Sequence, residues 1–236
     1  MTFLLALCAM GLAVSVNAQE KPVSFGVQAG VNFSNLNYSS NHENAVDPKS
    51  KTGFHVGVVA DLNVAPNFYI QPGLFLTTKG AINKFSEKDD YYDYYYSSEA
   101  NISASYLQLP ILASYRFQVN NAVKIAVNAG PYFSYGLGGK IKWTEKLYYE
   151  GETETATEEF DIFGKSTEDD LKGDIKRFDA GIRFGAGAYI NNKFYIGLNY
   201  DLGLSNIAIT DNEYGDWGSG DKLKNNCFSI SVGYNF

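Results

Sequence analysis

Apolar residues stand at every second position in the last ten residues of the chain. Phe228, Ile230 and Val232 alternate there with Ser229 and Ser231. A repeat of two places the two sets of side chains on opposite faces of a β-strand. Seven further segments show the same alternation. The eight predicted strands span residues 23–34, 53–64, 68–77, 107–117, 123–134, 177–190, 194–205 and 227–236.

The connections between these predicted strands alternate strictly between short and long. The short connections are residues 65–66, 118–121 and 191–192, and the long ones are residues 37–51, 84–100, 144–173 and 208–223. Outer-membrane barrels combine short periplasmic turns with long external loops, and both of their termini lie in the periplasm. The pattern therefore predicts an all-β, eight-stranded, antiparallel up-and-down transmembrane β-barrel with its four long loops outside the cell.

Three prolines fall inside the predicted strands, where each of them removes a backbone hydrogen-bond donor. They are Pro72, Pro110 and Pro131. Gly73 and Gly130 adjoin two of these prolines. We therefore expect local β-bulges at these points.

The two faces of the predicted strands differ in chemistry. One face carries Val, Ile, Leu, Phe and Ala, and the other is rich in Gly, Ser, Asn, Gln, Asp and Arg. Aromatic residues near strand ends, such as Phe117 and Phe194, match the aromatic girdles of membrane barrels. These features favour an apolar face that points outward to lipid. A soluble β-sandwich or lipocalin-like barrel, with the apolar face inward, is the alternative.

The N-terminal segment has the pattern of a secretory signal. Residues 3–16 are almost all apolar, and small residues at Val16 and Ala18 suit cleavage before Gln19. The run is too short to cross a membrane as a helix. We expect a signal peptide at residues 1–18 and a barrel domain at residues 19–236. Cleavage would leave Cys227 as the single cysteine, so no internal disulfide is expected.

Composition and charge narrow the classes of function. The hydrophobic fraction of 45 % and the mean hydropathy of −0.21 are those of an ordinary soluble protein. A membrane barrel has the same averages, because its strands alternate apolar and polar residues. The net charge of −7 argues against nucleic acid as a partner, since nucleic-acid binding needs a basic surface.

Several motifs resemble those of the PorT-like outer-membrane β-barrel proteins of Bacteroidetes. They are residues 106–112, 130–133 and 178–181, together with the opening 26–32 and the closing 234–236. The resemblance implies an eight-stranded barrel that the outer-membrane assembly machinery inserts. Substrates of that machinery often end in an aromatic residue, as this chain does at Phe236. The resemblance implies no particular activity.

The inward face of the predicted barrel contains charged residues. An eight-stranded barrel is just wide enough for side chains to fill it, and a buried charge needs a partner. We expect a plug of hydrogen bonds and ion pairs in which Asp179 or Asp201 contacts Arg183 or Arg116. The predicted lumen network consists of Asp61, Arg116, Asp179, Arg183 and Asp201. A narrow porin-like channel for small solutes is the alternative.

The long connections have distinctive side chains. The second contains Tyr91, Tyr92, Tyr94, Tyr95 and Tyr96. Tyrosines provide rigid amphipathic contact area, so these residues form the predicted loop binding surface. The third, residues 144–173, is strongly acidic and is interpreted as a solvated, mobile loop. The alternative interpretation of this loop is that it binds divalent cations, which bridge it to lipopolysaccharide. The fourth has oxygen ligands of the Ca²⁺ type at 211–221, but without the EF-hand spacing.

The sequence favours a structural or interaction role over catalysis. The two histidines are His42 and His55, and only His42, beside Glu43, falls in a long loop. No serine or second acid is placed as its partner, so no enzyme, metal or cofactor is expected. The predicted protein is a monomer that presents its loops to an extracellular ligand. Its other expected partners are outer-membrane lipid and lipopolysaccharide and the assembly machinery.

Overall fold

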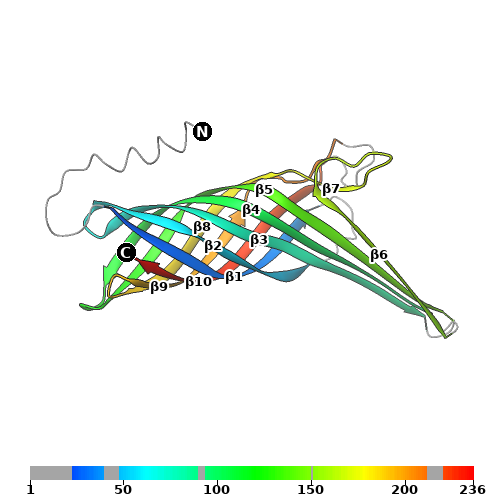
Figure 1. Cartoon of the computed structure of the whole chain (residues 1–236), viewed down its shortest axis with the longest axis horizontal. Helices are drawn as coiled ribbons and strands as arrows, with labels where there is room; N and C mark the ends of the chain where they lie inside the picture. The colour runs from blue at the N-terminus through cyan, green and yellow to red at the C-terminus, as the bar shows by residue number, and fades with distance from the viewer. Residues whose placement is uncertain (1–22, 40–47, 90–93, 150, 212–219) are drawn as a thin grey trace.

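The computed structural model describes residues 23–39, 48–89, 94–149, 151–211 and 220–236. The predicted signal peptide lies outside these residues. The described residues form one sheet, antiparallel except for a short parallel contact between its last two strands in the pairing order, that curls into a closed barrel (Figure 1). Its strands are β1 (Val23–Ser39), β2 (Lys49–Ala65), β3 (Phe68–Asp89), β4 (Tyr94–Gln118), β5 (Val123–Tyr149), β6 (Glu152–Phe163), β7 (Lys172–Ile175), β8 (Phe178–Ile190), β9 (Phe194–Gly203) and β10 (Lys222–Asn235).

Eight of these strands form the ring of the barrel. Within the ring, β1, β2, β3 and β4 each pair with the next strand along the chain, and β5 then pairs with β8. The order continues through β9 to β10, and β10 closes the ring by pairing antiparallel with β1. This confirms the predicted eight-stranded antiparallel barrel. The strands β6 and β7 lie outside the ring.

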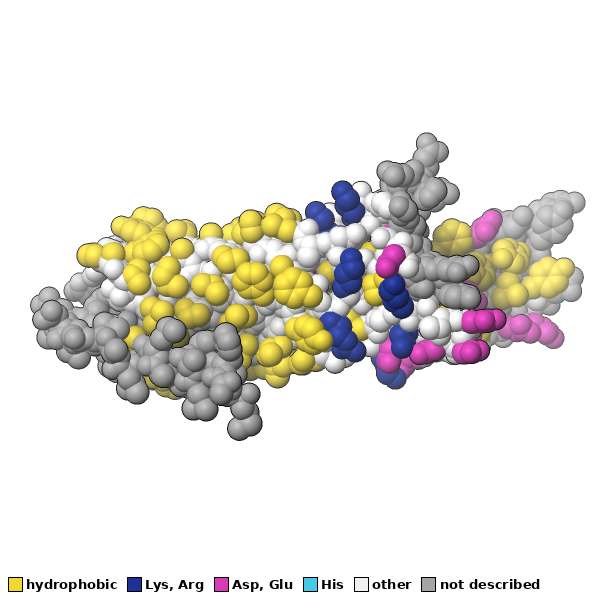
Figure 2. Space-filling view, turned by 90° about the horizontal axis from the view of Figure 1, so that it is seen from above, with side chains coloured by type: hydrophobic (Ala, Val, Ile, Leu, Met, Phe, Trp, Pro, Cys, Tyr) yellow, Lys and Arg dark blue, Asp and Glu magenta, His cyan; other side chains and the backbone are white. Residues whose placement is uncertain are grey.

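Apolar side chains cover the outside of the barrel. Along β9 the outward residues Ile196 and Leu198 are about half exposed, whereas Tyr195, which precedes Ile196 and points inward, is buried. The same alternation recurs on the other ring strands and produces a broad apolar band (Figure 2). Such a band matches the lipid-facing surface of a membrane barrel, and the polar set faces the lumen. No helix in the described residues is long and apolar enough to cross a membrane.

One end of the barrel is built from tight turns, and we call it the turn end. Asn67, Asn191 and Asn192 adopt positive φ angles in these turns, a conformation that asparagine tolerates well. Lys193 N donates a hydrogen bond to Ile190 O at 3.0 Å and closes the turn between β8 and β9. Phe236 N donates to Phe25 O at 2.9 Å, so β1 begins and β10 ends at this end too.

The other end differs from the sequence prediction. Residues 84–100 and 144–173 are predicted as long loops, but most of them are strand. At this end β3, β4 and β5 continue beyond the barrel and, with β6, form a protruding four-stranded sheet (Figure 1). We call this sheet, made of residues 83–89, 94–101, 140–149 and 152–160, the extension. The predicted mobile acidic loop is therefore largely ordered strand.

The extension begins where β5 changes its partner. β8 pairs with β5 up to Tyr135, and β6 takes over from Lys140. The β4–β5 register shifts by one residue between Ser105 and Tyr106, as at a β-bulge. A Cβ atom on Gly136 would lie 2.3 Å from the ring of Phe163, so glycine permits the close approach of β5 to that ring.

The prolines do not cause the predicted bulges. Pro72, Pro110 and Pro131 lie in β3, β4 and β5, and no register shift occurs at any of them. The strands instead keep their register across residues that lack a ladder hydrogen bond. Pro72 lies opposite Ile111, and Pro110 lies opposite Tyr132. The missing donors are therefore accommodated without an extra residue.

Candidate functional site

The lumen contains two clusters of charged side chains, and the first lies near the turn end. Arg116 contacts Asp61 at 2.7 Å and is stacked between the rings of Tyr69 and Tyr189. Gln71 donates a hydrogen bond to the same carboxylate at 2.6 Å. Both charged groups are buried. One anion and one cation therefore neutralise each other inside a cage of tyrosine rings.

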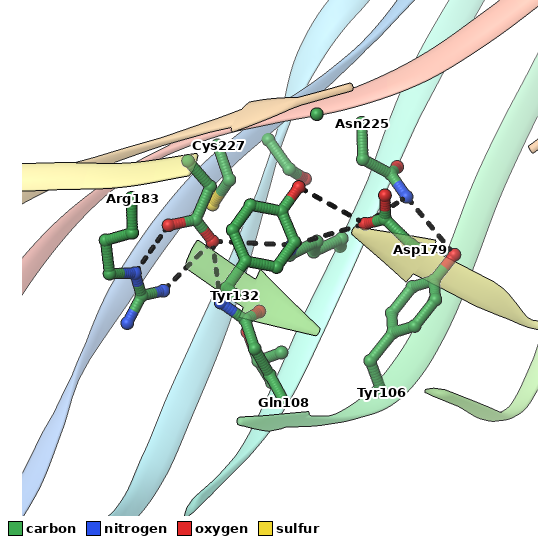
Figure 3. A network of polar contacts seen from close by, with 12 residues as sticks. Tyr106, Gln108, Tyr132, Asp179, Arg183, Asn225 and Cys227 are labelled. Carbon is green, nitrogen blue, oxygen red and sulfur yellow. Dashed lines mark hydrogen bonds and ion pairs between the residues drawn. The ribbon is translucent and has the colours of Figure 1, made fainter. Parts of the chain in front are cut away.

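The second cluster lies deeper in the barrel and is centred on Asp201. Figure 3 shows its members Gln108, Asp179 and Arg183. Arg183 donates two hydrogen bonds to the Asp201 carboxylate, at 2.5 and 2.9 Å. Gln108 donates a third at 2.9 Å. The Asp201 side chain is only 2 % exposed. A buried charge is stable only when it is paired and hydrogen-bonded. The Asp201 carboxylate meets this requirement, because each of its oxygens accepts a hydrogen bond from a charged or polar donor.

Lys79 joins Asp201 to Asp179. Its Nζ atom lies 3.4 Å from Asp201 and 3.8 Å from Asp179, over the ring of Tyr132. Ser205 and Asn225 donate further hydrogen bonds to Asp179. The cluster thus holds two cations and two anions. Lys79 is absent from the predicted network, although it continues the inward alternation of β3 two residues after Thr77.

The five predicted lumen residues therefore fall into two groups. Asp61 and Arg116 form the cluster near the turn end, while Asp179, Arg183 and Asp201 belong to the deeper one. The pairing of Arg183 with Asp201 is one of those that the sequence suggests. Arg116 instead contacts Asp61, and the cation nearest to Asp179 is Lys79. Asp61, Arg116, Asp179 and Asp201 are buried, and the side chain of Arg183 is 12 % exposed.

Apolar side chains fill the lumen at the end opposite the turns. They form one buried cluster that includes Leu36, Ile102, Tyr106, Phe163 and Ile207. These residues come from β1, β4, β6 and the segment after β9. The edge of the Tyr106 ring contacts the face of Phe163, with ring centroids 5.7 Å apart. Sequence reasoning missed this cluster because its members lie outside the strands that it predicted, and Ile162, Phe163, Ala208 and Leu223 lie in segments that it interpreted as loops.

The histidines do not form a catalytic set in the described part of the chain. His55 is buried in the lumen, where its ring nitrogens lie 2.8 Å from Asn32 Oδ1 and 3.0 Å from Ser231 Oγ. His42 and Glu43 lie outside the described residues. No group of three or more His, Cys, Asp or Glu residues in the described ranges is placed to hold a metal ion.

One face of the extension is aromatic and acidic. The strand register places Phe85, Ser98, Glu145 and Ala156 in one row across the four strands. Tyr96 lies in the adjacent row on the same face. Tyr96 donates a hydrogen bond to Glu145 at 2.7 Å, and this bond raises the pKa of the tyrosine. Trp143 Nε1 donates to the same carboxylate at 3.2 Å. This aromatic face comprises Asn83, Phe85, Glu87, Tyr94, Tyr96, Ser98, Ala100, Trp143, Glu145, Leu147, Tyr149, Glu152, Glu154, Ala156, Glu158 and Phe160.

The opposite face of the extension carries the lysines. Lys84 contacts Glu99 at 2.6 Å, and Lys140 forms an ion pair with Glu159. The lysine face comprises Lys84, Ser86, Lys88, Tyr95, Ser97, Glu99, Asn101, Lys140, Lys142, Thr144, Lys146, Tyr148, Thr153, Thr155, Thr157 and Glu159. The four strands contribute no lysine or arginine to the described aromatic face. The lysines of the extension thus share one face with carboxylates that pair with them, whereas the charged side chains of the aromatic face are all acidic.

The predicted tyrosine surface is only partly present as a unit. Tyr94 and Tyr96 lie on the aromatic face, and Tyr95 points to the lysine face. Tyr91 and Tyr92 lie outside the described residues. Trp143, Phe85 and Leu147, which sequence reasoning did not single out, complete the exposed apolar area. In Figure 2, apolar side chains reappear beyond a belt of lysine and arginine, next to acidic ones.

Comparisons with known proteins give a family and several distant structures. A family model for the outer membrane protein beta-barrel domain matches residues 17–208. No curated protein sequence matches the chain. Ail of Yersinia pestis, solved with the heparin analogue sucrose octasulfate, shares 14 % identity over 92 % of this chain and 100 % of its own, with a TM-score of 0.32. Neisserial surface protein A shows the same identity and coverage, with a TM-score of 0.38.

Proposed function

Because the chain belongs to the outer membrane protein β-barrel domain family, we propose that it is a monomeric interaction protein whose barrel anchors the extension in the external medium. Family membership implies a location in the outer membrane. The observation that carries the proposal is the exposed aromatic face, which stands beyond the apolar band. Aromatic side chains exposed to water on a rigid sheet are typical of binding surfaces.

The orientation follows from the construction of the two ends. Outer-membrane barrels keep tight turns and termini in the periplasm. We therefore propose that the turn end is periplasmic and that the extension is extracellular. We further propose that the chain is PorT-like, that the assembly machinery inserts it after signal cleavage, and that the belt of lysine and arginine side chains in Figure 2 contacts lipopolysaccharide. The motifs at residues 106–112 and 130–133 support the first of these assignments.

Labelling of intact cells tests this orientation. We expect a cysteine at Thr155, in β6 of the extension, to react with a membrane-impermeant maleimide on whole cells. A cysteine at Lys193, in the turn between β8 and β9, should react only after lysis. Cys227 is buried and supplies a low background in the parent protein. The reverse pattern of labelling would contradict the proposed orientation.

A filled lumen predicts an electrically silent protein. The mature chain, refolded and inserted into a planar bilayer, should give no defined current steps. The two charged clusters and the apolar cluster leave side chains in contact along the lumen, and ions would have to displace them. Heat-modifiable migration of the same sample checks that the barrel is folded. Steady current steps would favour the second candidate function, a narrow channel for small solutes.

A further inference from the structure

The strand β6 has one paired edge and one open edge. β5 pairs with it over ten residue pairs, from Lys140 opposite Asp161 to Tyr149 opposite Glu152. On its other side β7 meets it only at Asp161 and Phe163. No described strand pairs with that side over residues 152–160. Its backbone N–H and C=O groups can therefore accept an added strand.

Two hollows lie next to this open edge. One, of about 310 Å³, is lined by Trp143, Glu158, Phe160 and Leu171 among others. The second, of about 640 Å³, shares Glu158, Phe160 and Leu171 and adds Lys140 and four further carboxylates, those of Glu159, Asp161, Asp169 and Asp170. Glu158 and Glu159 point to opposite faces of β6, so the second hollow opens onto the edge itself. An extended segment along β6 would thus have space for its side chains on both faces.

The charges at this edge select the kind of segment that can bind. Glu152, Glu154 and Glu158 project to the aromatic face, to which the extension contributes no lysine or arginine. Glu159 and Asp161 project to the other face, where Lys140 pairs with Glu159 and lies opposite Asp161, so the unbalanced negative charge is that of the aromatic face. A second copy of β6 would bring like charges opposite one another, which destabilises strand pairing. A strand with lysine or arginine would form favourable cross-strand pairs instead. The edge therefore disfavours self-association and favours a basic partner.

The neighbouring aromatic surface adds a requirement for apolar side chains. Trp143 is 39 % exposed and Leu147 is 36 % exposed. Both lie on β5, one strand in from the open edge, on the face to which the glutamates of β6 project. Trp143 also lines the smaller hollow at this edge, so long apolar side chains of an added strand can reach it, whereas short polar ones cannot.

From this geometry we infer that the extension binds an extended basic peptide segment, which adds to the open edge of β6 with lysine or arginine and apolar side chains on the aromatic face. This inference rests on the proposed function, because the extension must be accessible from the medium. Backbone hydrogen bonds would supply affinity, and the alternate side chains would supply specificity.

Fluorescence anisotropy of labelled synthetic peptides tests the inference with the refolded full barrel. The probe is a peptide in which Thr alternates with Lys and Leu, so that Lys and Leu share one face of a strand. One control peptide has the same composition in blocks, and another carries N-methyl groups on alternate amides. We expect binding of the alternating peptide, and at least tenfold weaker binding of both controls, because each removes the strand register or its hydrogen bonds.

Matched variants locate the site. Glu158→Gln should weaken binding about fivefold and Trp143→Ala about tenfold, corresponding to the loss of one cross-strand charge pair and one aromatic contact. Their controls are Glu99→Gln and Tyr95→Ala on the lysine face, which should change the affinity less than twofold. Equal losses in both sets would overturn the inference, since nonspecific attraction to an acidic protein would then explain the binding.

The proposed function and this inference can fail separately. If the cysteine at Thr155 is labelled on whole cells and the alternating peptide does not bind, the inference is wrong and the extracellular presentation of the extension stands. If the peptide binds but only the cysteine at Lys193 is labelled on whole cells, the surface has the inferred specificity and the orientation is wrong.

Discussion

Replacing Asp201 with Asn is expected to destabilise the barrel by about 3–5 kcal/mol, the usual cost of removing one partner from a buried ion pair. Asp201 accepts two hydrogen bonds from Arg183 and one from Gln108, and Lys79 lies 3.4 Å away. Asparagine has nearly the same shape but no charge. The substitution therefore leaves two cations facing the single carboxylate of Asp179. Equilibrium unfolding by urea in phospholipid vesicles, followed by tryptophan fluorescence, measures the change.

Two variants check that charge balance is the cause. Glu99→Gln removes an exposed partner of Lys84 and should cost at most about 1 kcal/mol, as is usual for surface pairs. The double variant Asp201→Asn with Lys79→Met removes one charge of each sign and should recover much of the lost stability. A loss for Asp201→Asn as small as that for Glu99→Gln would mean that water, rather than side chains, surrounds the carboxylate.

Replacing Leu198 with Arg is expected to cost about 2–4 kcal/mol, the penalty for a charged side chain at the middle of a membrane barrel. Leu198 is 50 % exposed and lies midway along β9, between Ala186 of β8 and Ile230 of β10. Its outward side chain would meet hydrocarbon. The same urea titration in vesicles measures the difference in unfolding free energy.

The matched control for this variant is Leu147→Arg in the extension. Leu147 is also partly exposed, but it stands beyond the apolar band, where arginine would meet water. We expect a change within about 0.5 kcal/mol, as for ordinary surface substitutions. Similar effects at both positions would contradict the assignment of the band as the lipid-facing surface.

The eight ring strands could be predicted because each separates two different environments. Lipid on one side and a polar lumen on the other require apolar and polar residues to alternate, as at Phe228 to Val232. The extension could not be found in this way. Both of its faces contact water, so residues 152–159 consist of Glu, Thr and a single Ala and do not alternate between apolar and polar types. The β-branched threonines are the only local indication of a strand there.

By itself, the sequence determined which residues point inward, because side-chain direction in a strand depends only on parity along the chain. Asp61, Arg116, Asp179, Arg183 and Asp201 were identified from that parity alone. Only the tertiary structure decided which of them meet. Strand tilt and stagger bring Lys79 of β3 beside Asp179 of β8 and Asp201 of β9, and these are properties of the closed ring. The same holds for the open edge of β6, since an edge is defined by the strands that are not paired with it.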